Sequence, residues 1–154
     1  MIFINITIIS GGQTGVDRAA LDFALKNGIP CRGWCPLGRL AEDGVISHKY
    51  PLKETKTSKY EERTRLNVKN SDGTLILYEN EMDEGTVLTH KLALEMNKPV
   101  LITEPPIDQT FNKEKLSNWI TQNHISELNI AGPRESSSPG IYKLTFSFLE
   151  KILG

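Results

Sequence analysis

The chain has 154 residues, with 18 Lys and Arg against 19 Asp and Glu, a formal net charge of −1 at pH 7. This length fits a single domain over residues 1–154 with a buried core. The near-neutral charge gives no reason to expect binding to nucleic acid or to an acidic membrane surface. No segment approaches the length of a membrane span, and the apolar start Met1–Ile4 lacks the basic region of a signal peptide. We therefore expect a cytoplasmic protein, in which the two cysteines, Cys31 and Cys35, are reduced and no metal site forms.

The first strongly patterned stretch is a strand, a glycine turn and a helix. Residues 6–9 are an apolar, β-branched run that predicts a strand, and apolar residues at helical spacing after Val16 predict a helix that ends near Gly28. Glycines let the backbone approach a ligand, and the free amides at a helix start favour an anion. We predict a phosphate or another oxyanion on this turn, although its glycines could instead serve packing alone. The turn consists of Ser10, Gly11, Gly12, Gln13, Thr14 and Gly15.

The spacing of this turn matches neither the dinucleotide-binding G-x-G-x-x-G motif nor a Walker A loop. Gln13 and Thr14, however, add side-chain donors to the backbone amides. These two residues favour a ligand over a purely structural turn.

The middle of the chain is less regular. A short strand is expected at residues 31–34, followed by an irregular stretch over residues 35–57 that contains Arg39. So long a loop in a compact domain is usually functional or mobile. Residues 59–70 predict a weakly amphipathic helix in which Arg63 shares one face with other polar side chains. The alternative for this helix is that its charges face only water.

A second strand–glycine–helix junction follows. Residues 74–78 predict a strand, and an acidic run leads from it to Gly85 and Thr86, where the next helix begins. The acidic residues disfavour a simple phosphate cradle, but they would suit a cation or an amine of the ligand. The remaining expected elements are strands at residues 99–103 and 127–131, a helix at 112–123 and the loop that starts at Gly132. A last helix should follow, with Ser137 or Ser138 as its N-cap and Pro139 in its first turn.

The alternation of strands and helices predicts a three-layer α/β domain. Its parallel sheet should have about five strands, with the order 2-1-3-4-5 favoured and helices on both faces. Because ligands bind at the carboxyl ends of such strands, the loops Ser10–Gly15, Glu79–Thr86 and Gly132–Ser138 should meet at one edge. The sequence therefore predicts one binding site made from three loops.

Three stretches together carry a family resemblance: Ser10–Ala19, Gly33–Gly44 and Ala131–Ser136. They resemble the molybdenum cofactor carrier family, a branch of the group that includes LOG-type, "lysine decarboxylase-like" proteins. The resemblance implies a Rossmann-like domain that forms a homo-oligomer (a dimer or tetramer) and binds its ligand at the strand ends. It also implies molybdopterin, the molybdenum cofactor, as a ligand of some members.

The wider group suggests an alternative, a phosphoribohydrolase that cleaves nucleoside monophosphates. Arg63 resembles the arginine that these enzymes carry, and Gly85-Thr86 resembles the end of their glycine loop. Two leading glycines are absent, however, and Thr89 stands where the resemblance requires a glutamate. Threonine cannot stabilise an oxocarbenium-like charge, although Glu84 or Glu81 of the longer loop could replace the glutamate. We assign no catalytic residue and favour binding over turnover. A third hypothesis is a nucleotide-sensing module without enzymatic activity.

We therefore expect a carrier that binds a phosphorylated heterocyclic ligand. Trp34 could stack on a flat heterocycle or simply pack in the core. Arg39 and Arg134 could bind a phosphate in a bidentate manner or lie on the surface. The full set of candidate binding residues is Ser10, Gly11, Gly12, Gln13, Thr14, Gly15, Trp34, Arg39, Arg63, Gly85, Thr86 and Arg134.

Overall fold

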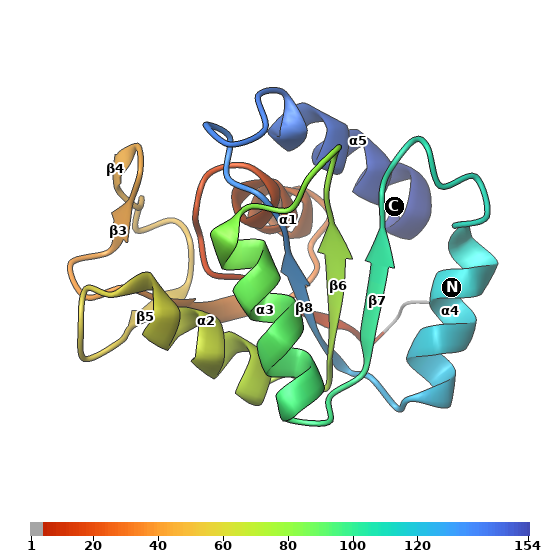
Figure 1. Cartoon of the computed structure of the whole chain (residues 1–154), viewed down its shortest axis with the longest axis horizontal. Coiled ribbons are helices and arrows are strands. Elements are labelled where there is room, and N and C mark those ends of the chain that lie inside the picture. Colours follow the sequence, from red (N-terminus) through yellow and green to blue (C-terminus); the bar gives the residue numbers. More distant parts are fainter. Residues whose placement is uncertain (1–4) are drawn as a thin grey trace.

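The computed structural model describes residues 5–154, which form a six-stranded parallel sheet between two layers of helices (Figure 1). The sheet contains β1 (Thr7–Ile9), β2 (Cys31–Cys35), β5 (Leu52–Glu54), β6 (Gly73–Leu77), β7 (Val100–Thr103) and β8 (Glu127–Ala131). The helices are α1 (Val16–Lys26), α2 (Tyr60–Lys69), α3 (Glu84–Glu95), α4 (Lys113–Gln122) and α5 (Ile141–Leu153). None of these helices is long and apolar enough to cross a membrane. The segment Met1–Ile4, on which we expected no signal peptide, lies outside the described residues.

The predicted α/β class is confirmed, but the predicted strand order is wrong. The observed order is β5-β2-β1-β8-β6-β7, with all neighbours parallel. The last strand, β8, lies between β1 and β6, which we had expected to be neighbours. If β8 is numbered as strand 1 and the other strands of the sheet follow in chain order, the sheet order reads 4-3-2-1-5-6. Successive strands then add outward from the centre of the sheet, first on the β1 side and then on the β6 side. This insertion makes β1, β8 and β6 consecutive, so their three loops lie side by side.

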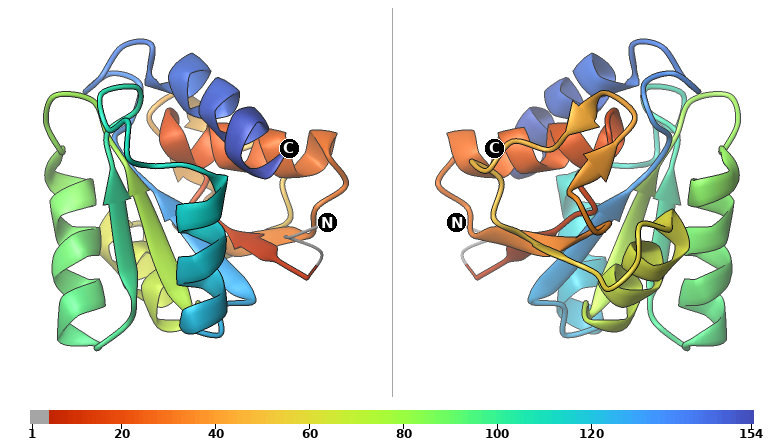
Figure 2. Two further views of the ribbon diagram at one scale, coloured as in Figure 1. Left: turned by 90° about the vertical axis from the view of Figure 1, so that its right-hand side faces the viewer. Right: turned by 90° about the vertical axis from the view of Figure 1, so that its left-hand side faces the viewer.

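Helices cover both faces of the sheet (Figure 2). α1 packs on α5, and α4 also contacts α5, whereas α2 and α3 pack together on the opposite face. Residues 73–77 of β6 are all buried because both faces of a central parallel strand are covered. The main core includes Phe23 of α1, Leu75 of β6 and Leu149 of α5, each with no exposed surface.

The stretch over residues 35–57, expected to be irregular, contains the last residue of β2, a small hairpin and an edge strand. β3 (Leu40–Ala41) and β4 (Gly44–Val45) form the hairpin, and β5 adds to the sheet beside β2. Ile46, Tyr50 and Leu52 form a second apolar cluster with Leu21 of α1. The segment therefore packs against the glycine turn that follows β1.

Candidate functional site

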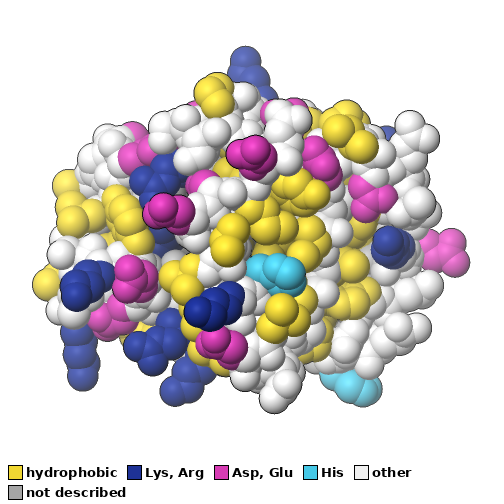
Figure 3. Space-filling model, viewed as in Figure 1, with side chains coloured by type: hydrophobic (Ala, Val, Ile, Leu, Met, Phe, Trp, Pro, Cys, Tyr) yellow, Lys and Arg dark blue, Asp and Glu magenta, His cyan; other side chains and the backbone are white. Residues whose placement is uncertain are grey.

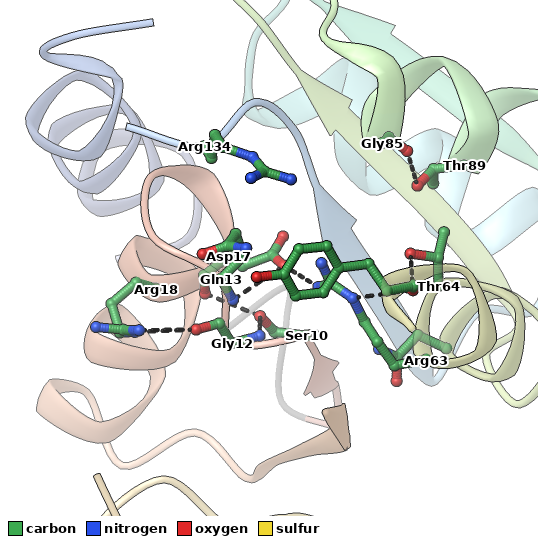
Figure 4. Close-up of polar contacts among 12 residues, drawn as sticks. Ser10, Gly12, Gln13, Asp17, Arg18, Arg63, Thr64, Gly85, Thr89 and Arg134 are labelled. Atoms are coloured by element: carbon green, nitrogen blue, oxygen red, sulfur yellow. Dashed lines mark hydrogen bonds and ion pairs between the residues drawn. The ribbon is translucent and has the colours of Figure 1, made fainter. Parts of the chain in front are cut away.

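A polar cleft opens at the carboxyl ends of the three central strands, where the glycine turn, α2, the start of α3 and the loop after β8 meet (Figure 4). The predicted residues that line it are Gly11, Gln13, Arg63, Gly85 and Arg134. The main polar residues that the candidate set missed are Asp17, Thr64, Asn67, Asp83, Thr89 and Asn129. The expected meeting of the three loops is thus seen, and α2 closes the fourth side.

A buried ion pair forms the floor of the cleft. Arg63 Nη1 of α2 lies 3.0 Å from Asp17 Oδ2 of α1, and both side chains are about 10% exposed. The backbone amide of Gln13 also donates a hydrogen bond to this carboxylate, at 3.3 Å. Burial raises the pKa of Asp17, and the charge of Arg63 opposes that increase. A Cβ atom at Gly11 would lie 2.1 Å from Arg63 Nη1, so only glycine leaves room for the ion pair there.

Asp83 organises the far wall of the cleft. It caps α3, because its Oδ1 accepts hydrogen bonds from the Thr86 amide (3.0 Å) and the Thr86 hydroxyl (2.6 Å). Its Oδ2 accepts a hydrogen bond from the backbone amide of Arg134, at 3.0 Å. One carboxylate therefore joins the start of α3 to the loop after β8 and uses both oxygens to do so.

Arg134 extends its guanidinium group into the mouth of the cleft (Figure 4). Its ion-pair partner is Glu42, but Nη1 lies 3.9 Å from that carboxylate, which is longer than a charge-assisted hydrogen bond. The guanidinium carbons of Arg134 and Arg63 lie 5.3 Å and 5.2 Å from the centre of the Tyr60 ring. Arg134 is therefore held in place by an aromatic face while its donors stay available to a ligand.

The comparisons with known proteins agree with this arrangement. Residues 8–153 match the model of the circularly permutated YpsA SLOG family. The chain belongs to this family. Its sheet order, with the last strand beside the first at the centre, is the order that a circular permutation produces. None of the curated protein sequences matches the chain.

A crystal structure from Syntrophus aciditrophicus SB, named "Putative molybdenum carrier protein", is similar to the chain throughout. The two share 45% sequence identity with a TM-score of 0.91, and the alignment covers 97% of this chain and 96% of that one. The family assignment therefore rests on sequence and fold over nearly the full length.

In this member of the circularly permutated YpsA SLOG family, the glycine turn does not present a free row of backbone amides. The Gly12 amide donates to Ser10 Oγ, that of Gln13 to Asp17, that of Thr14 to Gln13 Oε1 and that of Val16 to the Pro133 carbonyl. The prediction that free backbone amides of the turn bind an anion is therefore wrong for these four N–H groups, because each already donates to a protein acceptor. Their acceptors come from the turn itself, from α1 and from the loop after β8, and the last two could not be inferred from the turn sequence alone.

Arg39 does not face the cleft. It is 7% exposed, and its guanidinium donates to the carbonyls of Ile46, Ser47, Tyr50 and Leu52 at 2.8–3.0 Å. The prediction that Arg39 contacts a ligand is therefore corrected, since these carbonyls occupy its donors. Arg39 holds the segment that packs against the glycine turn.

Other candidate residues also lie outside the cleft. Thr86 is 1% exposed and donates its hydroxyl to Asp83, the cap of α3. Ser10 is buried, and its hydroxyl donates to the Asp17 carbonyl. The backbone of Trp34 pairs with the Asn67 side chain, and the indole does not line the cleft. Gly12, Thr14 and Gly15 shape the turn from behind the cleft wall. These residues position the site but do not line it.

Two of the missed residues had a usable signal. Asp83 stands three residues before Thr86 at a helix start, the position of an N-cap, and Asn129 is a polar residue within a buried apolar strand. Within residues 5–154, no three His, Cys, Asp or Glu side chains are grouped to hold a metal ion.

Behind the cleft, Asp22 of α1 joins two tyrosines. Its two carboxylate oxygens accept hydrogen bonds from the Tyr50 and Tyr142 hydroxyls, both at 2.5 Å. Burial and the bond to Asp22 raise the pKa of Tyr142 to about 12, and they also raise the pKa of Tyr50. The cluster ties α5 and the 46–52 segment to α1.

Asp22→Asn is expected to lower the pKa of Tyr142 toward its ordinary value of 10, because the carboxylate charge is removed. An alkaline titration followed by tyrosinate absorbance measures this shift. In the unchanged protein, Tyr142 loses its proton at a lower pH in the unfolded chain than in the folded chain. The free energy of unfolding therefore falls as the pH rises from about 10 through the pKa of Tyr142 in the folded protein. The variant should show a weaker fall. Glu114→Gln, an exposed change on α4, is the control, and equal titration curves for both variants would contradict the assignment.

Proposed function

We propose that this chain binds and carries a phosphorylated, heterocycle-bearing small molecule, with the molybdenum cofactor as its candidate cargo. The observation that carries the proposal is that two donor groups line one cleft. They are the Arg134 guanidinium, 3.9 Å from Glu42, and the Gln13 Nε2 group, which has no partner within residues 5–154. The name of the Syntrophus protein, a molybdenum carrier, supports the choice of cargo.

Arg134 is the group that favours a phosphate or a similar oxyanion, because the Asp17 and Asp83 carboxylates that also line the cleft are bonded to other protein groups. Asp17 compensates Arg63 at 3.0 Å, whereas Arg134 has only the looser contact with Glu42. A planar guanidinium can donate two parallel hydrogen bonds to a phosphate. Arg134 is therefore the residue that we assign to the anionic group of the cargo.

A second groove supports a flat ring system next to that anionic group. It runs between α2 and α3 and shares Arg63, Gly85 and Arg134 with the cleft. Its walls include Tyr60 and Leu88, an aromatic face and an apolar side chain that suit a heterocycle. We place the phosphate of the cargo in the cleft and its ring in the groove.

The hydrolase alternative receives less support from the chemistry of the cleft. The Thr89 hydroxyl, at the position where a glutamate was required, donates to the Gly85 carbonyl at 2.9 Å. The nearby Asp83 carboxylate uses both oxygens to cap α3 and to bind the Arg134 amide. Neither group is available as a general acid or nucleophile, so carriage is favoured over cleavage of a nucleotide.

Arg134→Ala is expected to weaken binding of isolated molybdenum cofactor by about tenfold to a hundredfold, because a charge-assisted contact is lost. Equilibrium dialysis with molybdenum analysis measures the affinity. The control is Lys91→Ala, which removes an exposed cation of α3 that lines neither the cleft nor the groove. Nucleoside monophosphates are assayed in parallel for binding and for release of free base. Base release would contradict the carrier proposal, and saturation by a nucleotide alone would indicate the sensing module.

The homo-oligomer and the cytoplasmic location stay predictions. α3 exposes Val87 and Leu94, which are 53% and 57% accessible, and an apolar strip runs across the middle of the face shown in Figure 3. This strip is the surface that we expect a second copy to cover.

A further inference from the structure

The side chain of Gln13 has an orientation that its neighbours determine. One terminal atom accepts hydrogen bonds from two backbone amides, those of Thr14 (3.0 Å) and Glu42 (2.9 Å). This atom must be the side-chain oxygen, because the amino group of a glutamine is itself a donor and cannot accept hydrogen bonds from two N–H groups. The amino group, Nε2, is therefore the polar atom that Gln13 can offer to the cleft it lines.

This amino group has no partner among the described residues although it is buried. Gln13 is only 5% exposed. An unpaired buried donor costs free energy, so native proteins rarely keep one without a partner such as water, an ion or a ligand. Asp17 compensates the charge of Arg63, but Arg134 lines the same cleft with its carboxylate partner 3.9 Å away, so the acceptor that best fits the Gln13 donor is an anionic oxygen.

The β3–β4 hairpin holds Gln13 in this orientation. The Glu42 carboxylate accepts hydrogen bonds from the Thr14 hydroxyl and from the amide and hydroxyl of Ser136. The neighbouring Asp43 pairs with Arg18 at 2.9 Å and 3.1 Å. The hairpin is thus fixed to the glycine turn and to the loop after β8, and it presents the Glu42 amide to Gln13.

We infer that Gln13 recognises an oxyanion oxygen of the bound molecule, and that Glu42 positions Gln13 for this contact. The inference deepens the proposed function and rests on it for the phosphorylated cargo. Gln13 is a specificity residue, because its free terminal group can donate but cannot accept. A molecule that presents an amine at this point leaves the donor unpaired and is rejected.

Gln13→Glu tests the contact with little change in shape. One carboxylate oxygen keeps the two bonds from the loop amides, and the other replaces the donor with an anionic acceptor. With inorganic phosphate and AMP as probes in isothermal titration calorimetry, the dissociation constant should rise at least about tenfold. Gln122→Glu makes the same chemical change at an exposed site of α4 and should leave binding unchanged. Equal affinities for Gln13→Glu and the unchanged protein would show that the amide only binds water, and would overturn the inference.

Glu42→Ala tests the positioning role through coupling. It should weaken binding about threefold to tenfold in the unchanged protein, but less than about twofold in a Gln13→Ala background. A merely structural role for Glu42 predicts the same loss in both backgrounds, and that result would remove Glu42 from the inference.

The probes separate this inference from the proposed function. If phosphate binds in a Gln13-dependent way while isolated molybdenum cofactor does not bind, the inference stands and the proposed cargo is wrong. If the cofactor binds the unchanged protein and Gln13→Glu equally, the cargo stands and the inference is wrong. If no probe binds the unchanged protein at millimolar concentration, both are overturned.

Discussion

Arg39→Ala is expected to lower the free energy of unfolding by about 3–5 kcal/mol, a large effect for a single substitution. The change leaves four backbone carbonyls between residues 46 and 52 without their donor. It also loosens Ile46 and Leu52, whose side chains pack against the backbone of Gly12. Urea unfolding followed by circular dichroism measures the loss.

Two companion variants sharpen this test. Arg39→Lys keeps the charge but lacks the planar fork that reaches four acceptors, so it should recover less than half of the loss. Arg65→Ala removes an exposed arginine and should change stability by less than about 0.5 kcal/mol. If Arg39→Ala were as mild as Arg65→Ala, then Arg39 would not anchor this segment.

Arg39 also illustrates what local pattern can and cannot predict. Its position in a long polar loop suggested a ligand-binding cation, because sequence cannot show which carbonyls a loop will fold around an arginine. The acceptors lie 7 to 13 residues away in a segment without periodicity. An arginine in a glycine-rich loop is thus equally suited to a phosphate and to a cluster of carbonyls.

Helices and strands were predictable where the spacing of the apolar residues and the turn-forming residues at the ends indicated the same element. β6 starts at the glycine of Asp72-Gly73 and continues as a mainly apolar run. α5 has its apolar residues at helical spacing, but its N-cap is Gly140, so the predicted N-cap at Ser137 or Ser138 is wrong. The strand order was not predictable, because parallel strands that are buried on both faces have similar apolar sequences. Nothing local to Glu127–Ala131 indicates that it lies between β1 and β6.

The site was predictable at the level of loops and only partly at the level of residues. Gln13, Gly85 and Arg134 were found because they follow strands, and such positions meet at the carboxyl edge of a parallel sheet. The roles of Asp17 and Asp83 depend on tertiary partners, the Arg63 guanidinium and the Arg134 amide. Those partners are 46 and 51 residues away in the sequence.

The second large effect concerns the buried ion pair. Arg63→Met is expected to cost about 3–5 kcal/mol of unfolding free energy at neutral pH, because it leaves the Asp17 carboxylate buried without a cation. Methionine keeps much of the length and volume of the side chain, so the loss reports mainly on charge. Arg65→Met, on the exposed side of the same helix, is the matched control. Chemical unfolding at several pH values measures both variants.

The loss should depend on pH in a definite direction. Without Arg63, the opposing effect of its charge disappears, and burial raises the pKa of Asp17 further above its ordinary value of 3.8. Between that value and the folded pKa, the unfolded chain is ionised while the folded chain holds a proton. Stability of the variant therefore falls as the pH rises through this window, and its deficit is smaller near pH 4 than at pH 7.

A double substitution separates charge from packing. Asp17→Asn combined with Arg63→Met removes both charges and should recover most of the stability, since a buried ion pair is often no more stabilising than a neutral replacement. The recovered protein should nevertheless bind phosphate more weakly, because Arg63 lines the cleft beside Arg134. A deficit that is independent of pH and persists in the double variant would mean that Arg63 stabilises α2 through packing. In that case the ion pair would not be the element that sets the shape of the cleft floor.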